Sequence, residues 1–351
     1  MILRDPIHGL VSFEGRAERV VEALLSTREV QRLRRVRQLG LASLVFPGAE
    51  HSRFAHAVGA AHVMSRLTER LRACDGDLPI DARLDDEAAD DAVAAALLHD
   101  LGHGPFSHLF EDVLPHARHH EEWTAEAVLD PGTDVHRALE RLSGGMSDRV
   151  AALLTGKHRL RYLARAISGP LDVDRADYLL RDSHMTGVRY GLYDLDWLLR
   201  ALAFGRVGTE WVLAIEGRKG LPPIESFFLA RHFMYQQVYH HKAIRAAEAL
   251  VRSVFSRLTE RIRDGQRPGP VPRPLEAAAL GEPLSLGEYL ELDDAGLLSA
   301  MADWERGSDP ELSRLCGALR NRVLPKTIPL AEDGEPTWGE AARRAREVVA
   351  A

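Results

Sequence analysis

The sequence predicts a mainly α-helical protein with one small β-hairpin. Apolar residues recur at helical spacing over long stretches, as in Phe54, Val58, Ala61, Met64 and Leu67. The clearest strand signal is EWVLAI at residues 210–215, which Gly208 and Gly217 bound as a small hairpin. With 351 residues, 45% of them apolar and 28% charged, the chain can bury a large core in one big domain or two smaller ones.

The N-terminal elements begin with an extended segment over residues 2–13. A helix is expected from Ser26 to Gly40, because Ser-Thr precedes Glu29 and glycine closes the pattern. This helix is basic, which indicates either a solvated face or a phosphate contact. Further helices are expected over residues 53–74 and 86–101.

The later elements are helices with one linker. Helices are expected in the segments at residues 116–129, 150–155, 161–167 and 222–264, the last being unusually long. Residues 266–274 are rich in proline and glycine and form a linker. Beyond them a small helical region ends in a charged terminal helix.

Composition limits the compartment and the partners. The formal net charge of −7 argues against a polyanion held by net charge alone. The two cysteines, Cys74 and Cys316, show no paired spacing and indicate a reducing compartment. No signal peptide opens the chain, and no apolar run approaches the length of a membrane span. We therefore expect a soluble cytoplasmic protein.

Chemically versatile residues gather where the helix over 86–101 ends. Its apolar run closes with His99-Asp100, and Gly102, Gly104 and Pro105 then break the helix. A rigid stem that ends in adjacent imidazole and carboxylate groups is typical of a metal site. Among 16 histidines one such pair is also expected by chance, so its partners decide the interpretation.

Three other stretches supply partners. On the helix over 53–74, Arg53 and His56 lie three residues apart on one face. A stripe at four-residue spacing contains Asp174, Tyr178 and Asp182, with Arg175 beside it. A second stripe, on the long helix, contains Arg231, Tyr235, Tyr239 and Lys242.

Together these residues can bind a metal and a phosphate ester. The mixed nitrogen and oxygen donor set consists of His56, His99, Asp100 and Asp174. Such a set suits Mn, Mg, Fe, Ni or Zn and leaves positions open for water and substrate. The arginines and Lys242 would provide cations for phosphate oxygens, and the tyrosines a surface for a sugar or base.

The motif order resembles the HD superfamily of metal-dependent phosphohydrolases, and more closely the HD-domain deoxynucleoside triphosphate (dNTP) triphosphohydrolases. The resemblance covers about residues 5–243. It runs through DPIHG, QRLRRVRQLG, VFPGAEHSRFAHAVG, LLHDLGHGPFSH, HHEE, DVDRADYLLRD and VYHHK, and LPKTI at residues 324–328 is similar too. It implies an HD-domain helical bundle over residues 1–265, with a small helical C-terminal region at 275–351 packing on it.

The resemblance implies a role for each matching residue. The metal ligands would be His56, His99, Asp100 and Asp174. The catalytic histidines would be His103, His108 and His120, with Glu111 in their hydrogen-bond relay. Triphosphate contacts would come from Arg53, Arg175, Arg231 and Lys242. Sugar contacts would come from Gln38, Tyr178, Asp182 and Tyr239, with Tyr235 close by.

The resemblance implies an enzyme that converts a dNTP and water to deoxynucleoside and inorganic triphosphate, a dGTPase-like reaction. It implies Mn²⁺ or Mg²⁺ as the cation, with Fe, Ni, Co or Zn as alternatives. It also implies a homo-oligomer, and leaves room for a nucleotide activator and weak binding of single-stranded nucleic acid. Arg175, Glu111 and Tyr235 stand where the animal enzymes have Lys, Asp and His, which concerns base preference and rate more than the reaction.

Two other functions fit the same residues. The first is an HD-type phosphodiesterase or nucleotidase that acts on another nucleotide or nucleic-acid phosphate ester. The second is a nucleic-acid-binding module that contacts phosphates through the basic residues 32–37. A pure binding module would have no use for an open metal position, so the ordered histidines and aspartates favour an enzyme.

Overall fold

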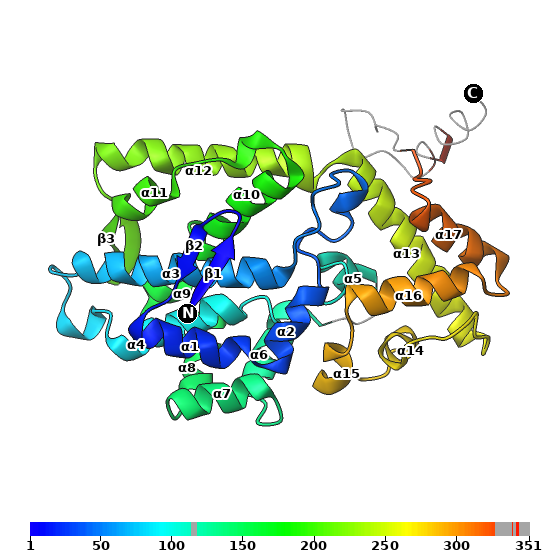
Figure 1. Cartoon of the computed structure of the whole chain (residues 1–351), viewed down its shortest axis with the longest axis horizontal. Coiled ribbons are helices and arrows are strands. Elements are labelled where there is room, and N and C mark those ends of the chain that lie inside the picture. Colours follow the sequence, from blue (N-terminus) through cyan, green and yellow to red (C-terminus); the bar gives the residue numbers. More distant parts are fainter. Residues whose placement is uncertain (114–117, 327–338, 340–341, 344–351) are drawn as a thin grey trace.

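The chain folds into a bundle of α-helices with two small antiparallel hairpins (Figure 1). The computed structural model describes residues 1–113, 118–326, 339, 342 and 343. The strands are β1 (Ile2–Asp5), β2 (Gly9–Ser12), β3 (Leu202–Val207) and β4 (Glu210–Ile215). The helices up to the middle of the chain are α1 (Gly15–Leu25), α2 (Arg28–Arg32), α3 (Arg53–Ala73), α4 (Asp86–Leu98), α5 (His108–Val113), α6 (His120–Leu129), α7 (Asp134–Leu142), α8 (Met146–Leu154) and α9 (Arg161–Ile167). Those that follow are α10 (Val173–Thr186), α11 (Leu195–Ala201), α12 (Leu221–Met234), α13 (Lys242–Arg263), α14 (Arg273–Leu280), α15 (Leu286–Leu290), α16 (Asp294–Glu305) and α17 (Pro310–Arg320). The mainly α prediction is confirmed, and so is the hairpin that contains residues 210–215.

The centre of the bundle is formed by α3, which packs against both α4 and α10. The apolar stretch of α4 is buried almost throughout, which explains why it is apolar on every side. On α3 the residues that face this core include Ala57, Ala61 and Met64. Because buried helices of this kind are rigid, the side chains at their ends are held in fixed positions.

The predicted length of the helix over residues 26–40 is wrong. Regular helix ends at Arg32, a 3₁₀ turn covers Leu33–Arg35, and Arg37 then pairs with Ser52 in an isolated bridge. The Arg32 guanidinium is buried and donates hydrogen bonds to the carbonyl oxygen of His103 at 2.9 Å. This contact turns the chain inward, where a solvated helix would have continued. Helix α1, which ends just before this segment, was not predicted from the sequence.

The prediction of one long helix over residues 222–264 is also wrong. The structure has two helices there, α12 and α13, separated by a wide turn over Tyr235–Tyr239. The His240 N–H donates to the Tyr235 carbonyl oxygen at 3.0 Å, an i to i+5 bond, and His241 Nδ1 then caps α13 by accepting from the Ala243 N–H at 3.3 Å. The stripe predicted along one continuous helix face therefore does not exist as such.

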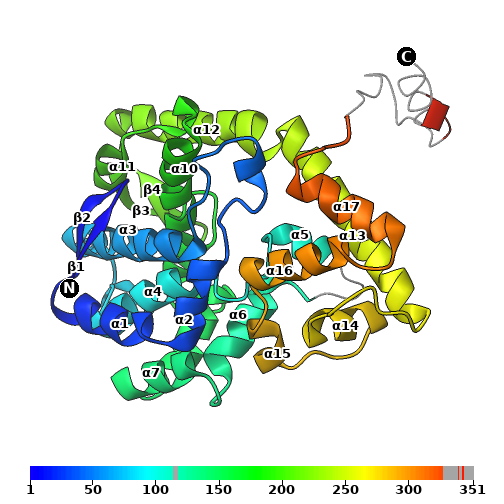
Figure 2. The ribbon, with the colours of Figure 1, turned by 45° about the vertical axis from the view of Figure 1, so that its right-hand side comes forward.

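The C-terminal helices α14–α17 lie beside α13 on one flank of the bundle, as a turned view shows (Figure 2). Their apolar side chains belong to the same hydrophobic cluster as those around α3 and α4. The charged terminal helix predicted from the sequence falls mostly outside the described residues, as do Thr327 and Ile328 of LPKTI. None of the helices in the described part of the chain combines the length and the apolar character that a membrane crossing requires.

The C-terminal region also braces the loop that follows α4. Phe106 and Ser107 adopt left-handed backbone conformations, with φ of 55° and 59°, which are unfavourable for residues with side chains. The Asp294 carboxylate accepts the Phe106 N–H at 2.9 Å, and the Tyr289 hydroxyl donates to the Gly102 carbonyl oxygen at 2.8 Å. These contacts hold residues 99–107 in place.

Candidate metal centre and adjoining cavity

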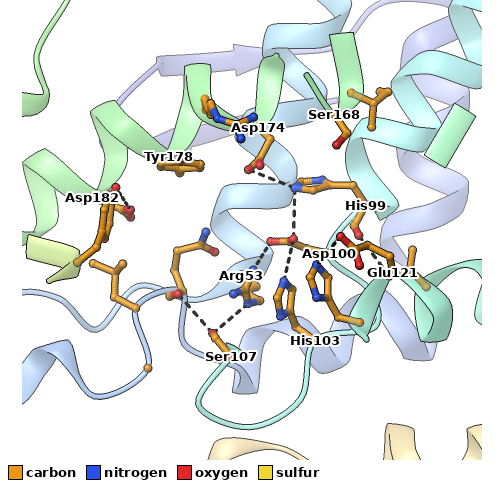
Figure 3. A pocket seen from close by; sticks show the side chains of 18 of the residues that line it. Arg53, His99, Asp100, His103, Ser107, Glu121, Ser168, Asp174, Tyr178 and Asp182 are labelled. Atoms are coloured by element: carbon orange, nitrogen blue, oxygen red, sulfur yellow. Dashed lines mark hydrogen bonds and ion pairs between the residues drawn. The ribbon is translucent and has the colours of Figure 1, made fainter. Parts of the chain in front are cut away.

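The four predicted metal ligands come from three segments of the chain, and three of them, His99, Asp100 and Asp174, are seen together in Figure 3. His56 lies on α3, His99 and Asp100 follow α4 directly, and Asp174 lies in the first turn of α10. His56 Nε2 is 3.2 Å from His99 Nε2 and 3.0 Å from Asp174 Oδ1. Asp100 completes the group, with Oδ1 3.4 Å from His99 Nε2 and Oδ2 3.7 Å from His56 Nε2.

The hydrogen bonds of the two imidazoles suit a cation between them. His56 Nδ1 donates to the Asp177 carboxylate at 2.8 Å, and His99 Nδ1 donates to the Ala96 carbonyl oxygen at 2.9 Å. Each imidazole therefore carries its proton on Nδ1 when neutral, so two Nε2 lone pairs face each other. Two lone pairs at 3.2 Å repel unless a proton or a metal cation is bound there, and without a metal a second proton on His56 takes this place. The donor set thus fits a divalent cation.

The charges around this centre agree with that chemistry. Burial acts to lower the pKa of His56, but hydrogen bonds to the Asp174 and Asp177 carboxylates raise this pKa to about 10. Burial acts to raise the pKa of Asp100, yet the Arg53 guanidinium holds this pKa well below its usual range. Asp100 is therefore ionised at neutral pH, and the centre attracts positive charge.

A second group of titratable side chains adjoins Asp100. Among the described residues, His103, Glu111 and His120 form a further set whose donor atoms lie close together. His120 Nδ1 donates to Glu111 at 2.9 Å, and the His103 and His120 rings stack with centroids 3.8 Å apart. His103 Nε2 is 3.3 Å from Asp100 Oδ1, so this group contacts the metal centre. The side chain of His108, the third predicted catalytic histidine, lies outside the described residues.

Within this second group, His103 has an unusual environment. Its ring is buried, and burial together with the nearby Arg53 charge lowers the pKa of His103 well below its usual range. His103 is therefore neutral at neutral pH, and a proton that reaches it is passed on and not kept, as in a relay. Gly102 allows this packing, because a Cβ there would lie 2.1 Å from the His120 carbonyl oxygen at the start of α6.

Both groups open onto a cavity of about 1080 Å³, which is large enough for a nucleotide. Its wall includes most of the predicted site residues: Gln38, Arg53, His99, Asp100, His103, His120, Asp174, Arg175, Tyr178, Asp182, Tyr235 and Tyr239. Arg231 and Lys242 do not line it. The break between α12 and α13 explains this difference, since Arg231 lies over the Tyr235 ring and Lys242 is exposed at the start of α13.

The wall of the cavity away from the metal centre holds a fixed carboxylate. Asp182 accepts from His51 Nε2 at 2.8 Å through one oxygen and from the Tyr239 hydroxyl at 2.8 Å through the other. Nearby, Gln38 Oε1 and Arg175 Nε are buried and have no hydrogen-bond partner among the described residues. An acceptor and a donor left unpaired in a cavity wall are suited to contacts with a polar ligand.

Sequence reasoning missed several residues of this region. His51, Asp177 and Arg181 support site residues from behind, and Arg161, Arg165 and Arg245 also line the cavity. For Asp177 a signal was available, because it lies three residues after Asp174 on the same helix. The sequence around Arg161, Arg165 and Arg245 shows only the pattern of a solvated helix face.

The basic segment at residues 32–37 has intramolecular partners. Arg32 is buried, Arg35 pairs with Asp293, and Arg37 pairs with Glu50. Arg34 lies over the Phe54 ring, with its guanidinium carbon 3.5 Å from the ring centroid. These contacts weigh against binding of a nucleic-acid phosphate backbone by this segment.

Comparison with known proteins agrees with this geometry. Residues 53–182, which carry all four predicted ligands, match the HD domain. The chain is 35% identical over 323 residues to the uncharacterized protein YwfO of Bacillus subtilis, covering 92% of this chain and 70% of that protein. A crystal structure of a phosphohydrolase from Bacteroides thetaiotaomicron superimposes with a TM-score of 0.80 at 32% identity, covering 95% of this chain and 80% of that one. The chain therefore belongs to the HD-domain family, and it is an HD-domain phosphohydrolase.

Within that family the similarity extends to dNTP hydrolases. The chain is 28% identical over 341 residues to a protein of Dictyostelium discoideum named deoxynucleoside triphosphate triphosphohydrolase SAMHD1 homolog, covering 93% of this chain and 60% of that protein. It is also 28% identical over 299 residues to the Bos taurus deoxynucleoside triphosphate triphosphohydrolase SAMHD1, of which it covers 48%. The chain thus spans about half to two thirds of these two relatives.

Proposed function

We propose that this protein is a metal-dependent dNTP triphosphohydrolase that converts a dNTP and water to deoxynucleoside and inorganic triphosphate. One observation carries the proposal. A cavity of nucleotide size has three of the four metal-centre donors, His99, Asp100 and Asp174, with adjacent cations on one part of its wall, and a fixed carboxylate with two tyrosines on another. The names of the SAMHD1 relatives support the same substrate class.

The phosphate part of the substrate would lie beside the metal centre. His56, His99, Asp100 and Asp174 would hold a divalent cation, which when bound acts as a Lewis acid on a phosphoryl oxygen. Arg53, already paired with Asp100, and Arg175, whose Nε is unpaired, would contact triphosphate oxygens. These positive charges compensate the negative charge that develops during phosphoryl transfer.

The reaction requires one bond to form and one to break. Oxygen from water bonds to the α-phosphorus while the bond between that phosphorus and the sugar 5′ oxygen breaks, and the leaving oxygen takes up a proton. His103 and His120, held by their stacking and by Glu111, are the described side chains placed to move that proton. The family resemblance assigns His108 to the same task.

The sugar would lie against the fixed carboxylate. Asp182, Gln38 and Tyr178 are placed for hydrogen bonds and packing, and Tyr239 would occupy the side on which a ribose carries its 2′-hydroxyl. The Tyr239 side chain is fixed there by its hydrogen bond to Asp182, so it would leave no room for a 2′-hydroxyl. This arrangement would favour deoxyribose over ribose.

Several partners belong to the proposal as well. The family resemblance favours Mn²⁺ or Mg²⁺ and a homo-oligomer and leaves room for a nucleotide activator, and the cysteine usage favours a cytoplasmic location. The main alternative keeps the metal centre and changes the substrate, as in an HD-type phosphodiesterase or nucleotidase. The cavity arginines Arg161 and Arg165, which no dNTP role explains, are the observation that favours this alternative.

Product analysis tests the proposed reaction directly. Purified protein is incubated with each dNTP and Mn²⁺, and the products are separated by ion-exchange chromatography. We expect deoxynucleoside and intact triphosphate, little turnover of the matching ribonucleotides, and no reaction in excess chelator. Release of orthophosphate or pyrophosphate would exclude this reaction, and turnover of cyclic nucleotides or oligonucleotides alone would establish the alternative.

A further inference from the structure

Asp177 lies directly behind the metal centre and does not line the cavity. Its carboxylate is fully buried and binds three side chains. One oxygen accepts from His56 Nδ1 at 2.8 Å and from Arg181 Nε at 2.7 Å. The other accepts from His8 Nε2 at 2.7 Å and from Arg181 Nη2 at 2.8 Å. Four hydrogen bonds thus fix one carboxylate against one metal ligand.

The N-terminal turn takes part in this network. Asp5 accepts the backbone N–H groups of Ile7 and His8 at 2.9 and 3.0 Å, which shapes the turn between β1 and β2. The same Asp5 carboxylate accepts from Arg181 Nη1 at 2.8 Å. Residues 5–8 are therefore tied to α10 twice, through Arg181 and through Asp177.

Gly59 makes the close approach of α10 and α3 possible. It lies on α3 one turn after His56, and a Cβ there would lie 1.9 Å from Asp177 Oδ1 and 2.4 Å from Arg181 Nη2. Only glycine leaves room for the Asp177–Arg181 pair to lie flat against α3. Gly59 on α3 and the Asp177–Arg181 pair on α10 thus act together to place this carboxylate beside His56.

We propose that Asp177 is a positioning residue that orients His56 and keeps its proton on Nδ1, and that His8 of the N-terminal turn contributes to metal affinity through Asp177. The inference rests on the metal centre of the proposed function and is independent of the substrate. An imidazole binds a metal through Nε2 only when its proton is on Nδ1. A carboxylate acceptor at Nδ1 favours that tautomer and increases the basicity of Nε2.

The charge balance behind His56 supports this role. The Asp177 carboxylate is fully buried and lies against the Arg181 guanidinium, which donates to both of its oxygens, at 2.7 and 2.8 Å. The positive charge of Arg181 compensates the carboxylate, so Asp177 can act on His56 as a charge-assisted hydrogen-bond acceptor.

Metal titration of variants tests this inference. Asp177→Asn and His8→Ala are prepared metal-free, and Co²⁺ binding is followed by its visible absorption. For Asp177→Asn we expect an affinity about 10- to 100-fold weaker and a changed Co²⁺ spectrum, as is typical when the partner of a ligating histidine is lost. For His8→Ala, which touches no ligand, we expect a smaller loss in the same direction, with normal circular dichroism.

A matched control is available in the same molecule. Asp91 is 1% exposed and binds Arg149 through both oxygens at 2.7 and 3.3 Å, but it contacts no proposed metal ligand. Asp91→Asn therefore removes a comparable buried carboxylate and should leave Co²⁺ affinity and spectrum unchanged. Unchanged binding in both Asp177→Asn and His8→Ala would overturn the inference while leaving the proposed function intact. A wild-type protein that binds no Co²⁺, Mn²⁺ or Mg²⁺ would overturn the metal centre itself.

Discussion

Replacing Asp174 with asparagine is expected to reduce dNTP hydrolysis by at least about 10³-fold, equivalent to about 4 kcal/mol of transition-state stabilisation. The carboxylate of Asp174 lies 3.0 Å from His56 Nε2 and 3.4 Å from His99 Nε2. Its loss removes one of two anionic donors, so bound metal is lost with it. Elemental analysis and turnover measurements on the same sample would check both effects.

The neighbouring Asp172 provides a control for this experiment. It caps α10 by accepting the Arg175 N–H at 2.8 Å, which asparagine can also do, and its ion pair with the Arg175 side chain involves no proposed metal ligand. Asp172→Asn should therefore retain the bound metal, and both variants should keep the helical circular dichroism of the wild type. If Asp174→Asn kept near-normal turnover and metal content, its assignment as a ligand would be wrong.

Replacing His103 with alanine is expected to lower kcat by about 10² to 10⁴-fold, the usual contribution of a general acid or base. His103 stacks on His120 and lies 3.3 Å from Asp100, between the relay and the metal centre. Since the pKa of His103 is held well below its usual range, the imidazole accepts and passes protons without carrying a permanent charge. Single-turnover kinetics with a dNTP and Mn²⁺ would measure the loss.

Metal content and substrate affinity separate this role from a structural one. We expect His103→Ala to keep its metal and its KM to change far less than its kcat. His184 is exposed near the end of α10, so His184→Ala controls for the loss of a histidine as such. Loss of metal from His103→Ala would instead show that His103 supports Asp100, and an unchanged kcat would remove it from the reaction.

The grouping of His56, His99, Asp100 and Asp174 could be predicted from the sequence because its signals are local. The His99-Asp100 pair ends an apolar helix, His56 follows Arg53 at helical spacing, and Asp174 begins a polar stripe. Each signal is weak alone, but together they give a mixed donor set, to which the family resemblance adds the role of metal ligands. That resemblance also brought in His103 and His120, for which spacing alone gave no role.

The remaining features depend on contacts between distant segments. The helix over 26–40 ends early because Arg32 is drawn into the core by carbonyl groups about 70 and 260 residues away in the sequence. The break between α12 and α13 depends on i to i+5 bonding over Tyr235–Tyr239, which apolar spacing does not reveal. The contact between Asp177 and His8 could not be predicted, because the two residues lie 169 positions apart in the sequence.

The measurement that tests the central claim most directly is a crystal structure of the protein grown with Mn²⁺, recorded with anomalous scattering at the manganese edge. We predict one strong anomalous peak within about 2.0–2.4 Å of His56 Nε2, His99 Nε2 and a carboxylate oxygen from each of Asp100 and Asp174. A structure in which these four side chains point apart, or in which manganese binds elsewhere, would contradict the account.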